Sequence, residues 1–121
     1  MTMTNPTEIT LHQQSKILEI AFDDGARYRL PFEFLRVYSP SAEVRGHGPG
    51  QEVLQAGKQQ VALLNVEPVG SYALKLTFDD GHDSGLYTWE YLRELGKYQD
   101  AMWHDYLRRM DEAGESRELQ N

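Results

Sequence analysis

The chain has no cysteine and no long hydrophobic run. Without cysteine, neither a disulfide framework nor a Cys-ligated metal site can form, and this composition fits a reducing compartment. No window approaches the roughly 20 apolar residues of a membrane-spanning helix, and the opening residues, MTMTNPTE, lack the basic and apolar segments of a signal peptide. We therefore expect a cytoplasmic protein that does not associate with a membrane.

Basic residues are also scarce. The 12 Lys and Arg residues face 19 Asp and Glu residues, which gives a net charge of -7. Because nucleic acids and anionic membranes are bound largely by Lys and Arg, this balance disfavours both as partners. A chain of 121 residues forms one domain with a real core. We expect this domain to span residues 1–113, followed by a flexible polar tail over residues 114–121.

Two segments of the chain repeat one pattern. Residues 18–36 and 74–93 both contain Leu-x-x-x-Phe-Asp-Asp-Gly, followed by an aromatic residue, Glu, an aromatic residue, Leu and Arg. Alternate apolar residues share one strand face, and Asp-Gly suits a tight hairpin turn. The pattern predicts a strand–turn–strand–helix unit that occurs twice, with Phe32 and Trp89 as equivalent core residues. Chance similarity between two common hairpins is the alternative.

Apolar periodicity and turn residues place the other elements. Strands are predicted at 6–11, 16–22, 26–30, 61–69, 72–78 and 85–88, and helices at 32–37, 89–95 and 97–113. Pro31 suits a helix start, Thr88 an N-cap and Gly96 a helix end. The turns are too short for parallel crossovers. The predicted fold class is therefore α+β, an antiparallel sheet of two quasi-repeated β-hairpin/short-helix units plus a C-terminal helix.

Residues 38–60 separate the two units and are rich in Gly, Ser and Pro. Such a segment predicts a loop, and a loop of this length inside one domain is usually functional or disordered. We expect residues 45–60 to be the most mobile internal segment. The glycines at 46, 48 and 50 lack the Gly-Lys-Ser/Thr ending of a phosphate loop, so we interpret them as a flexible linker.

Two runs identify a family. Residues 7–96 resemble the gamma-butyrobetaine-hydroxylase-like N-terminal domain family. The resemblance is carried by the runs LRVYSPSAEVRGH and NVEPVGSYALKLTFDDGHDSGLYTWEYLREL. Members of that family occur as small bacterial proteins, as N-terminal parts of gamma-butyrobetaine and trimethyllysine hydroxylases, and fused to Mrp-type iron-sulfur carrier ATPases. The resemblance implies a small α+β accessory domain.

The resemblance also implies a degenerate zinc site. In the hydroxylases the ligands are three cysteines in L-R-x-x-C-x-C-x-x-C and a histidine in the later hairpin, positions that fall here on Ser39, Ser41, Val44 and His82. Serine is a poor zinc ligand and valine is none, so the Cys3His-type site cannot close and no cofactor is expected. His82 is the residual metal-ligand candidate. A lone histidine beside a turn is otherwise a solvated or capping residue.

A different ligand set is the alternative. His47 could combine with the acidic cluster around the second turn, although nothing in the spacing fixes these groups on one face; the cluster comprises Asp79, Asp80, His82 and Asp83. Such a set would make the chain a zinc- or iron-binding protein.

Catalytic motifs are absent from the sequence. His82, Asp83 and Ser84 contain the letters of a hydrolase triad, but adjacent residues cannot align as nucleophile, base and orienting group. No H-x-D or H-x-E triplet supplies the iron ligands of the oxygenase relatives. We expect a non-enzymatic accessory domain with an unidentified protein partner, possible homo-oligomers, and a link to iron-sulfur carrier or oxygenase systems.

Overall fold

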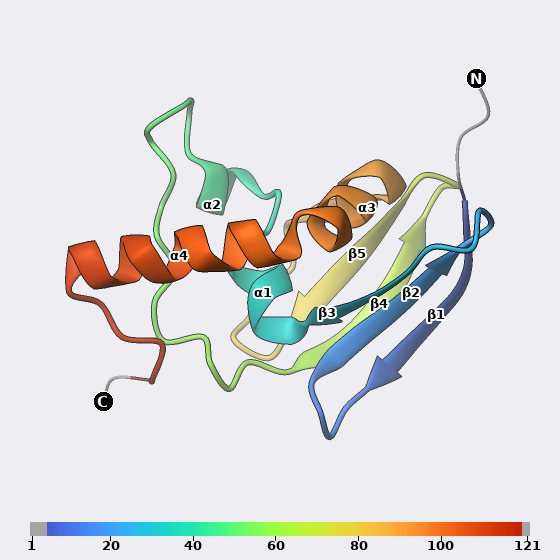
Figure 1. Cartoon of the computed structure of the whole chain (residues 1–121), viewed down its shortest axis with the longest axis horizontal. Coiled ribbons are helices and arrows are strands. Elements are labelled where there is room, and N and C mark those ends of the chain that lie inside the picture. The colour runs from blue at the N-terminus through green and yellow to red at the C-terminus, as the bar shows by residue number, and fades with distance from the viewer. Residues whose placement is uncertain (1–4, 120–121) are drawn as a thin grey trace.

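The computed structural model describes residues 5–119 and divides into two similar halves followed by a long helix (Figure 1). The elements are β1 (Pro6–His12), β2 (Ile17–Phe22), β3 (Arg27–Pro31), α1 (Phe32–Val37), α2 (Ala42–Arg45), β4 (Leu63–Val69), β5 (Ala73–Phe78), β6 (Leu86–Thr88), α3 (Trp89–Lys97) and α4 (Gln99–Ala113). Each half follows the order strand, strand, strand, helix. The α+β class and the two hairpin–helix units are confirmed.

The two hairpins lie in separate three-stranded antiparallel sheets, ordered β1-β2-β3 and β4-β5-β6, rather than in one continuous sheet. The central strands β2 and β5 place alternate apolar residues in a common core. These residues are Leu18, Ile20, Phe22, Leu74, Leu76 and Phe78, all at most 3% exposed. Phe32 and Trp89, at the starts of α1 and α3, join the same core and are 0% and 8% exposed, as predicted.

The Asp-Asp-Gly turns have matching backbone geometry. Gly25 and Gly81 have φ angles of 91° and 89°, in the left-handed region that glycine adopts without strain. Their N–H groups donate to the carbonyl oxygens of Phe22 and Phe78, over 3.0 and 3.1 Å. The repeat seen in the sequence is therefore a repeat of structure, and not a chance similarity.

The correspondence extends to the outer strands. A β-bulge shifts the register of β1 opposite Phe22, and an equivalent bulge shifts β4 opposite Phe78. These outer strands share no obvious motif in the sequence, so the repeat is longer than the residue pattern indicates.

The arginine at the end of each repeated segment reaches the turn of the other half. Arg36 Nε lies 2.8 Å from Asp80 Oδ2, and Arg93 pairs with Asp24. Because equivalent residues exchange partners, the halves meet as two subunits do across a two-fold axis.

Gly96 does not end α3, which continues to Lys97 and is capped at Tyr98. A Cβ atom at position 96 would lie 2.2 Å from Cγ of Tyr28. Glycine is needed here because the aromatic ring packs directly on the helix backbone, so the prediction of a helix end was wrong. The last helix consequently starts at Gln99 instead of residue 97.

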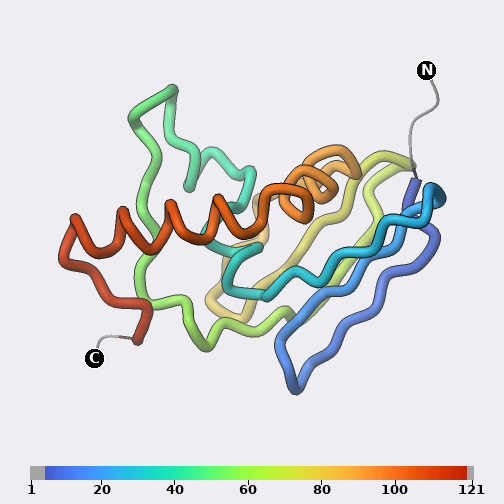
Figure 2. Tube along the Cα trace, in the orientation of Figure 1, coloured from blue at the N-terminus to red at the C-terminus, as the bar shows by residue number. Residues whose placement is uncertain are grey.

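The segment between α1 and β4 contains the short helix α2, which was not predicted because four residues give no periodicity. Figure 2 follows this green segment as it passes α4. Residues that follow α4 contact both this segment and α1. Gly57 N donates to Ser116 O, and the Arg117 guanidinium donates two hydrogen bonds to the Glu33 carboxylate of α1. Tail residues 120–121 lie outside the described residues, and the predicted flexibility of the tail stays a prediction.

Helix α4 spans 15 residues and turns Tyr106 and Met110 inward, against Val37. The helix is amphipathic, and its buried residues pack against α1 and the loop at Leu54 and Ala56. Over residues 5–119, no helix combines the length and apolar character required to cross a membrane.

Candidate functional site

Three of the four positions implied by the family resemblance lie next to one another. Ser39 follows α1, Ser41 caps the N-terminus of α2, and His82 follows the second Asp-Asp-Gly turn. Ser39 Oγ lies 2.8 Å from His82 Nε2, and these residues are 1% and 6% exposed. Ser41 N donates to Ser39 Oγ over 3.2 Å. The fold therefore brings Ser39 into contact with His82 and Ser41 into contact with Ser39, as the resemblance implies for these positions, although no thiolate is present.

Glu43 completes this cluster, although no sequence pattern marks it as a candidate. Its Oε2 lies 3.1 Å from His82 Nδ1. Since a carboxylate only accepts hydrogen bonds, Nδ1 carries the proton and Nε2 accepts from the Ser39 hydroxyl. Burial lowers the pKa of His82, as does the nearby Arg36, against the opposing effect of Glu43. The ring is consequently neutral at pH 7.

The order Ser39, His82, Glu43 resembles the array of a serine hydrolase, but the serine is closed off. Its hydroxyl already accepts the Ser41 N–H, and a Cβ on Gly85 would lie only 2.4 Å from Ser39 Oγ. A nucleophilic serine has to reach a substrate carbonyl carbon. With Ser39 1% exposed, there is no approach for one, so the geometry is that of a buried hydrogen-bond network.

Ser41 and Val44 are also accommodated without a metal. Ser41 Oγ lies 2.7 Å from Ser84 Oγ and accepts from Glu43 N over 3.2 Å. Val44 is 7% exposed on α2. Buried polar groups are stable when they are hydrogen-bonded, and each hydroxyl here has a partner.

The alternative ligand set is not brought together. Asp79 Oδ1 accepts from Ala62 N, Asp83 faces Lys75 at 3.7 Å, and His47 is part of the lining of a neighbouring pocket. Within residues 5–119, no group of three or more His, Cys, Asp or Glu side chains is arranged to hold a metal ion. The acidic residues of the second turn serve the fold.

Asp80 is the strongest electrostatic feature of this turn. Burial opposes its ionisation, but Lys58, the His82 N–H and Arg36 outweigh that effect and lower its pKa to about 2. Lys58 Nζ and Arg36 Nε lie 2.6 and 2.8 Å from Oδ2. Asp80 thereby ties the second turn to α1 and to the long loop.

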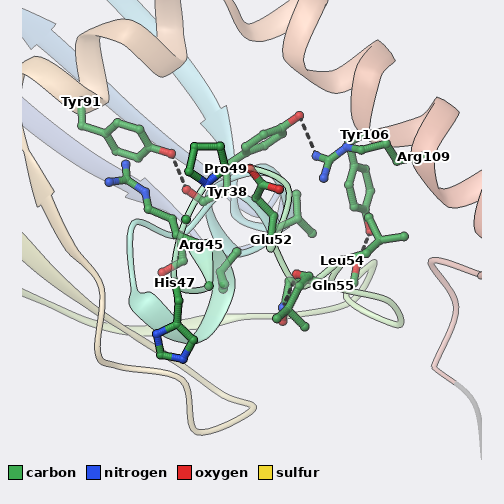
Figure 3. A pocket seen from close by; sticks show the side chains of 16 residues that line it. Tyr38, Arg45, His47, Pro49, Glu52, Leu54, Gln55, Tyr91, Tyr106 and Arg109 are labelled. Atoms are coloured by element: carbon green, nitrogen blue, oxygen red, sulfur yellow. Dashed lines mark hydrogen bonds between the residues drawn. The ribbon is translucent and has the colours of Figure 1, made fainter.

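A pocket of about 560 Å³ lies between α4 and the loop over residues 44–55 (Figure 3). It is close to the serine cluster, since Ser39 and Val44 are part of its wall. The lining is mainly apolar and aromatic, with a few charged residues; its members are Val37, Tyr38, Ser39, Val44, Arg45, Gly46, His47, Gly48, Pro49, Glu52, Val53, Leu54, Gln55, Tyr91, Tyr106 and Arg109. The interpretation of Gly46, Gly48 and Gly50 as a flexible linker gave no indication of this pocket.

Three tyrosines give the pocket a fixed frame. Tyr91 Oη donates to Tyr38 O over 2.5 Å, Tyr38 Oη to Met102 O over 2.7 Å, and Tyr106 Oη to Gln55 O over 2.6 Å. Burial raises the pKa of all three, that of Tyr106 to about 12. The phenols are therefore neutral at pH 7. They are far apart in the sequence, so no local pattern could have identified them.

The two arginines of the pocket have different surroundings. Arg109 of α4 donates to Tyr38 Oη over 3.2 Å, and its Nε lies 3.2 Å from Asp105 Oδ2. The guanidinium of Arg45 lies over the Tyr91 ring, 4.9 Å from its centroid. Figure 3 shows Arg45 and Arg109 on opposite sides of Tyr38.

Comparisons with known proteins identify a family and similar structures. A family model described as gamma-butyrobetaine hydroxylase-like, N-terminal, matches residues 9–93. Two structures solved by NMR are similar to this chain at 54% and 46% identity, with TM-scores of 0.84 and 0.83; they cover 99% and 100% of this chain and 94% and 93% of their own. None of the curated proteins compared matches the chain.

A crystal structure is also similar. It is a protein of unknown function of the DUF971 family from Acidithiobacillus ferrooxidans ATCC 23270, with 41% identity and a TM-score of 0.64. The match covers 76% of this chain and 92% of the other.

Proposed function

Because the chain belongs to the gamma-butyrobetaine hydroxylase-like N-terminal family, we propose that it is a non-enzymatic accessory domain that binds a protein partner through the pocket between the 44–55 loop and α4. The family description supports an accessory role, since it refers to the N-terminal part of a hydroxylase-like protein. A partner from an oxygenase or iron-sulfur carrier system is the first candidate. A cytoplasmic location and possible homo-oligomers belong to the same proposal, the former supported by the cysteine-free composition.

The observation that carries this proposal is the pocket itself. Its volume of about 560 Å³ lies within the usual range for binding sites, which combine an apolar lining with a few polar groups. Val53 on its rim is 52% exposed, although it is a large apolar residue. Exposed apolar surface beside a concave site is typical of protein interaction sites.

We also propose that the hydrogen-bonded serine cluster occupies the place of the zinc site that the family resemblance implies. Ser39, His82 and Glu43 form one set of contacts, and Ser41 with Ser84 forms another. These bonds hold α2, and with it the start of the pocket loop, against the second turn. The domain then needs no metal to present its pocket.

Partner capture tests the interaction proposal. Tagged wild-type protein, Val53→Glu and Leu64→Glu are exposed to extract of the native host, and bound proteins are identified by mass spectrometry. Leu64 is 66% exposed on β4 and is not part of the pocket lining, so its variant is a matched control. We expect one partner to bind wild type and Leu64→Glu but not Val53→Glu. Equal capture by all three would contradict the pocket as the binding site.

A fluorophosphonate probe tests the non-enzymatic part of the proposal. Such a probe labels serines that are activated by a histidine and open to substrate. The closed geometry of Ser39 predicts no labelling of the native protein. Labelling that is lost in Ser39→Ala would show that the cluster is a working nucleophile.

A further inference from the structure

We infer that the pocket recognises an extended partner segment in which a carboxylate neighbours an aromatic or large aliphatic side chain, with Arg45 as the group that binds the carboxylate. This inference rests on the proposed interaction function, and it adds the chemistry of the partner.

Arg45 is distinguished by its lack of an internal acidic partner. Every other arginine in residues 5–119 has a carboxylate within ion-pair distance, whereas Arg45 has none there. Its guanidinium lies over the Tyr91 ring, which holds a planar cation through its π face, and it also interacts with the Tyr91 hydroxyl. Because a guanidinium carries five N–H donors, others remain for a ligand. A guanidinium edge matches a carboxylate through two parallel hydrogen bonds.

The charge of the pocket also favours an anionic ligand. Arg45 and Arg109 against Glu52 give the lining a formal charge of +1 with His47 neutral, whereas the whole chain carries -7. Glu52 Oε1 accepts from Gly50 N over 3.3 Å, and Arg109 is already paired with Asp105. Arg45 is therefore the cation that remains for a ligand, on an otherwise acidic protein.

The apolar part of the ligand is set by the neighbouring wall. Tyr38, Tyr91 and Tyr106 present neutral rings, and Leu54 and Val53 extend this surface along the loop. An aromatic or aliphatic side chain next to the carboxylate would cover these groups. A purely acidic segment would leave them in water, and a purely apolar one would leave Arg45 without a partner.

The experiment begins with a phage-displayed library of random short peptides, selected on the wild-type protein. Peptides that pair Asp or Glu with an aromatic or large aliphatic residue should be enriched. A synthetic selected peptide and its Glu→Gln counterpart are then titrated by NMR into wild type, Arg45→Gln and Arg108→Gln. Arg108 is 57% exposed on α4, outside the pocket lining, and serves as the control arginine.

We expect Arg45→Gln, or Glu→Gln in the peptide, to weaken binding about tenfold each, since a hydrogen-bonded charge pair contributes on that order. Combining both changes should cost no more than either alone, because both remove the same contact. Arg108→Gln should bind as wild type does. Amide shifts should centre on Val53, Leu54 and Tyr91.

The other outcomes overturn the inference in distinguishable ways. Shifts at the pocket with equal affinity for wild type and Arg45→Gln would reject the role of Arg45 and keep the proposed interaction function. Shifts confined to the β1-β2-β3 sheet, or no selected peptide at all, would reject both. If free 3-phenylpropionate binds as tightly as the peptide, the pocket is a small-acid site and the partner segment is rejected.

Discussion

The two β-β-β-α halves share strand order, turn geometry and β-bulges, but the surroundings of the second Asp-Asp-Gly turn are more buried than those of the first. Their turns carry the same Asp-Asp-Gly residues, and each turn has an aspartate that pairs with the arginine of the opposite half. In the Arg36–Asp80 pair the side chains are 8% and 22% exposed, and in the Arg93–Asp24 pair they are 32% and 39% exposed. The residue after the turn is Ala26 in one half and the buried His82 in the other.

The difference comes from the connection at the end of each short helix. After α3 the chain enters α4 almost at once, whereas after α1 it forms the long loop that covers the second turn (Figure 2). Lys58 and Gln55 of this loop bond to Asp80 and Arg36, and Glu43 bonds to His82. The two repeated halves therefore differ mainly in the connection that follows their short helix. The pocket lies beside the longer connection, between α1 and β4.

Removing the equivalent core rings should have the largest effect, and a similar effect in both halves. Phe32→Ala and Trp89→Ala each remove a large buried ring from the shared core, so each should lower the free energy of unfolding by about 3–5 kcal/mol. Denaturant unfolding of both variants measures this. If only one of the two substitutions lowered the free energy of unfolding, the two halves would not contribute equally to the core.

The equivalent aspartates should differ. Asp80→Asn leaves the buried Arg36 without its anionic partner and should destabilise the fold by about 3 kcal/mol. Asp24→Asn should destabilise it less, because exposed ion pairs contribute little. Unfolding of both variants at pH 7 gives the comparison, and equal losses would contradict the difference in burial.

Acid unfolding checks the same pair. Because the folded-state pKa of Asp80 is about 2 against an ordinary 3.8, its stabilising effect is present above pH 3.8 and is lost as the pH falls toward 2. Asp80→Asn should remove this part of the acid dependence.

Restoring the three thiolates should convert the serine cluster into a zinc site. The variant Ser39→Cys, Ser41→Cys, Val44→Cys should gain about 2.7 kcal/mol at zinc concentrations ~100-fold above its dissociation constant, while the parent is unmoved. The prediction rests on the ligand pattern that the family resemblance implies and on the contact of Ser39 with His82. Melting with zinc and with chelator measures it, and the same variant with His82→Ala is the control. A triple variant indifferent to zinc would refute the alignment.

The smallest expected effect on stability comes from His82, the residue that follows the second Asp-Asp-Gly turn. Burial keeps the folded-state pKa of His82 below its ordinary 6.5. Just below pH 6.5 the His82 side chain is therefore protonated in the unfolded chain but not in the folded one. Protonation then favours the unfolded state, so the stability of the fold decreases as the pH drops through 6.5. His82→Ala, which copies Ala26 of the first half, should flatten this slope between pH 5 and pH 7. An unchanged slope would place the titration on another group.

Local patterns in the sequence were enough for the scaffold. Alternating apolar residues, Asp-Gly turns and Pro31 predicted the strands and short helices, because these signals act within a few residues. Gly96 was misread because its requirement comes from Tyr28, which is distant in the sequence. The pocket could not be predicted for the same reason: Tyr38, Tyr91 and Tyr106 meet only once the chain is folded. Ser39 and His82 were paired through the family resemblance alone, and Glu43 had no such guide.

Amide hydrogen exchange, with and without the partner captured by the wild-type protein, tests the central claim that the asymmetric loop forms the binding site. In the free protein, His47, Gly48 and Glu52 should exchange rapidly, whereas Gly46, Gln51 and Val53, whose N–H groups donate to backbone carbonyl oxygens over 2.9, 3.0 and 2.8 Å, should exchange more slowly. The partner should slow exchange in this loop and leave the Asp23–Gly25 turn unchanged. Protection of that turn or of the β1-β2-β3 sheet, with the loop unaffected, would contradict the account.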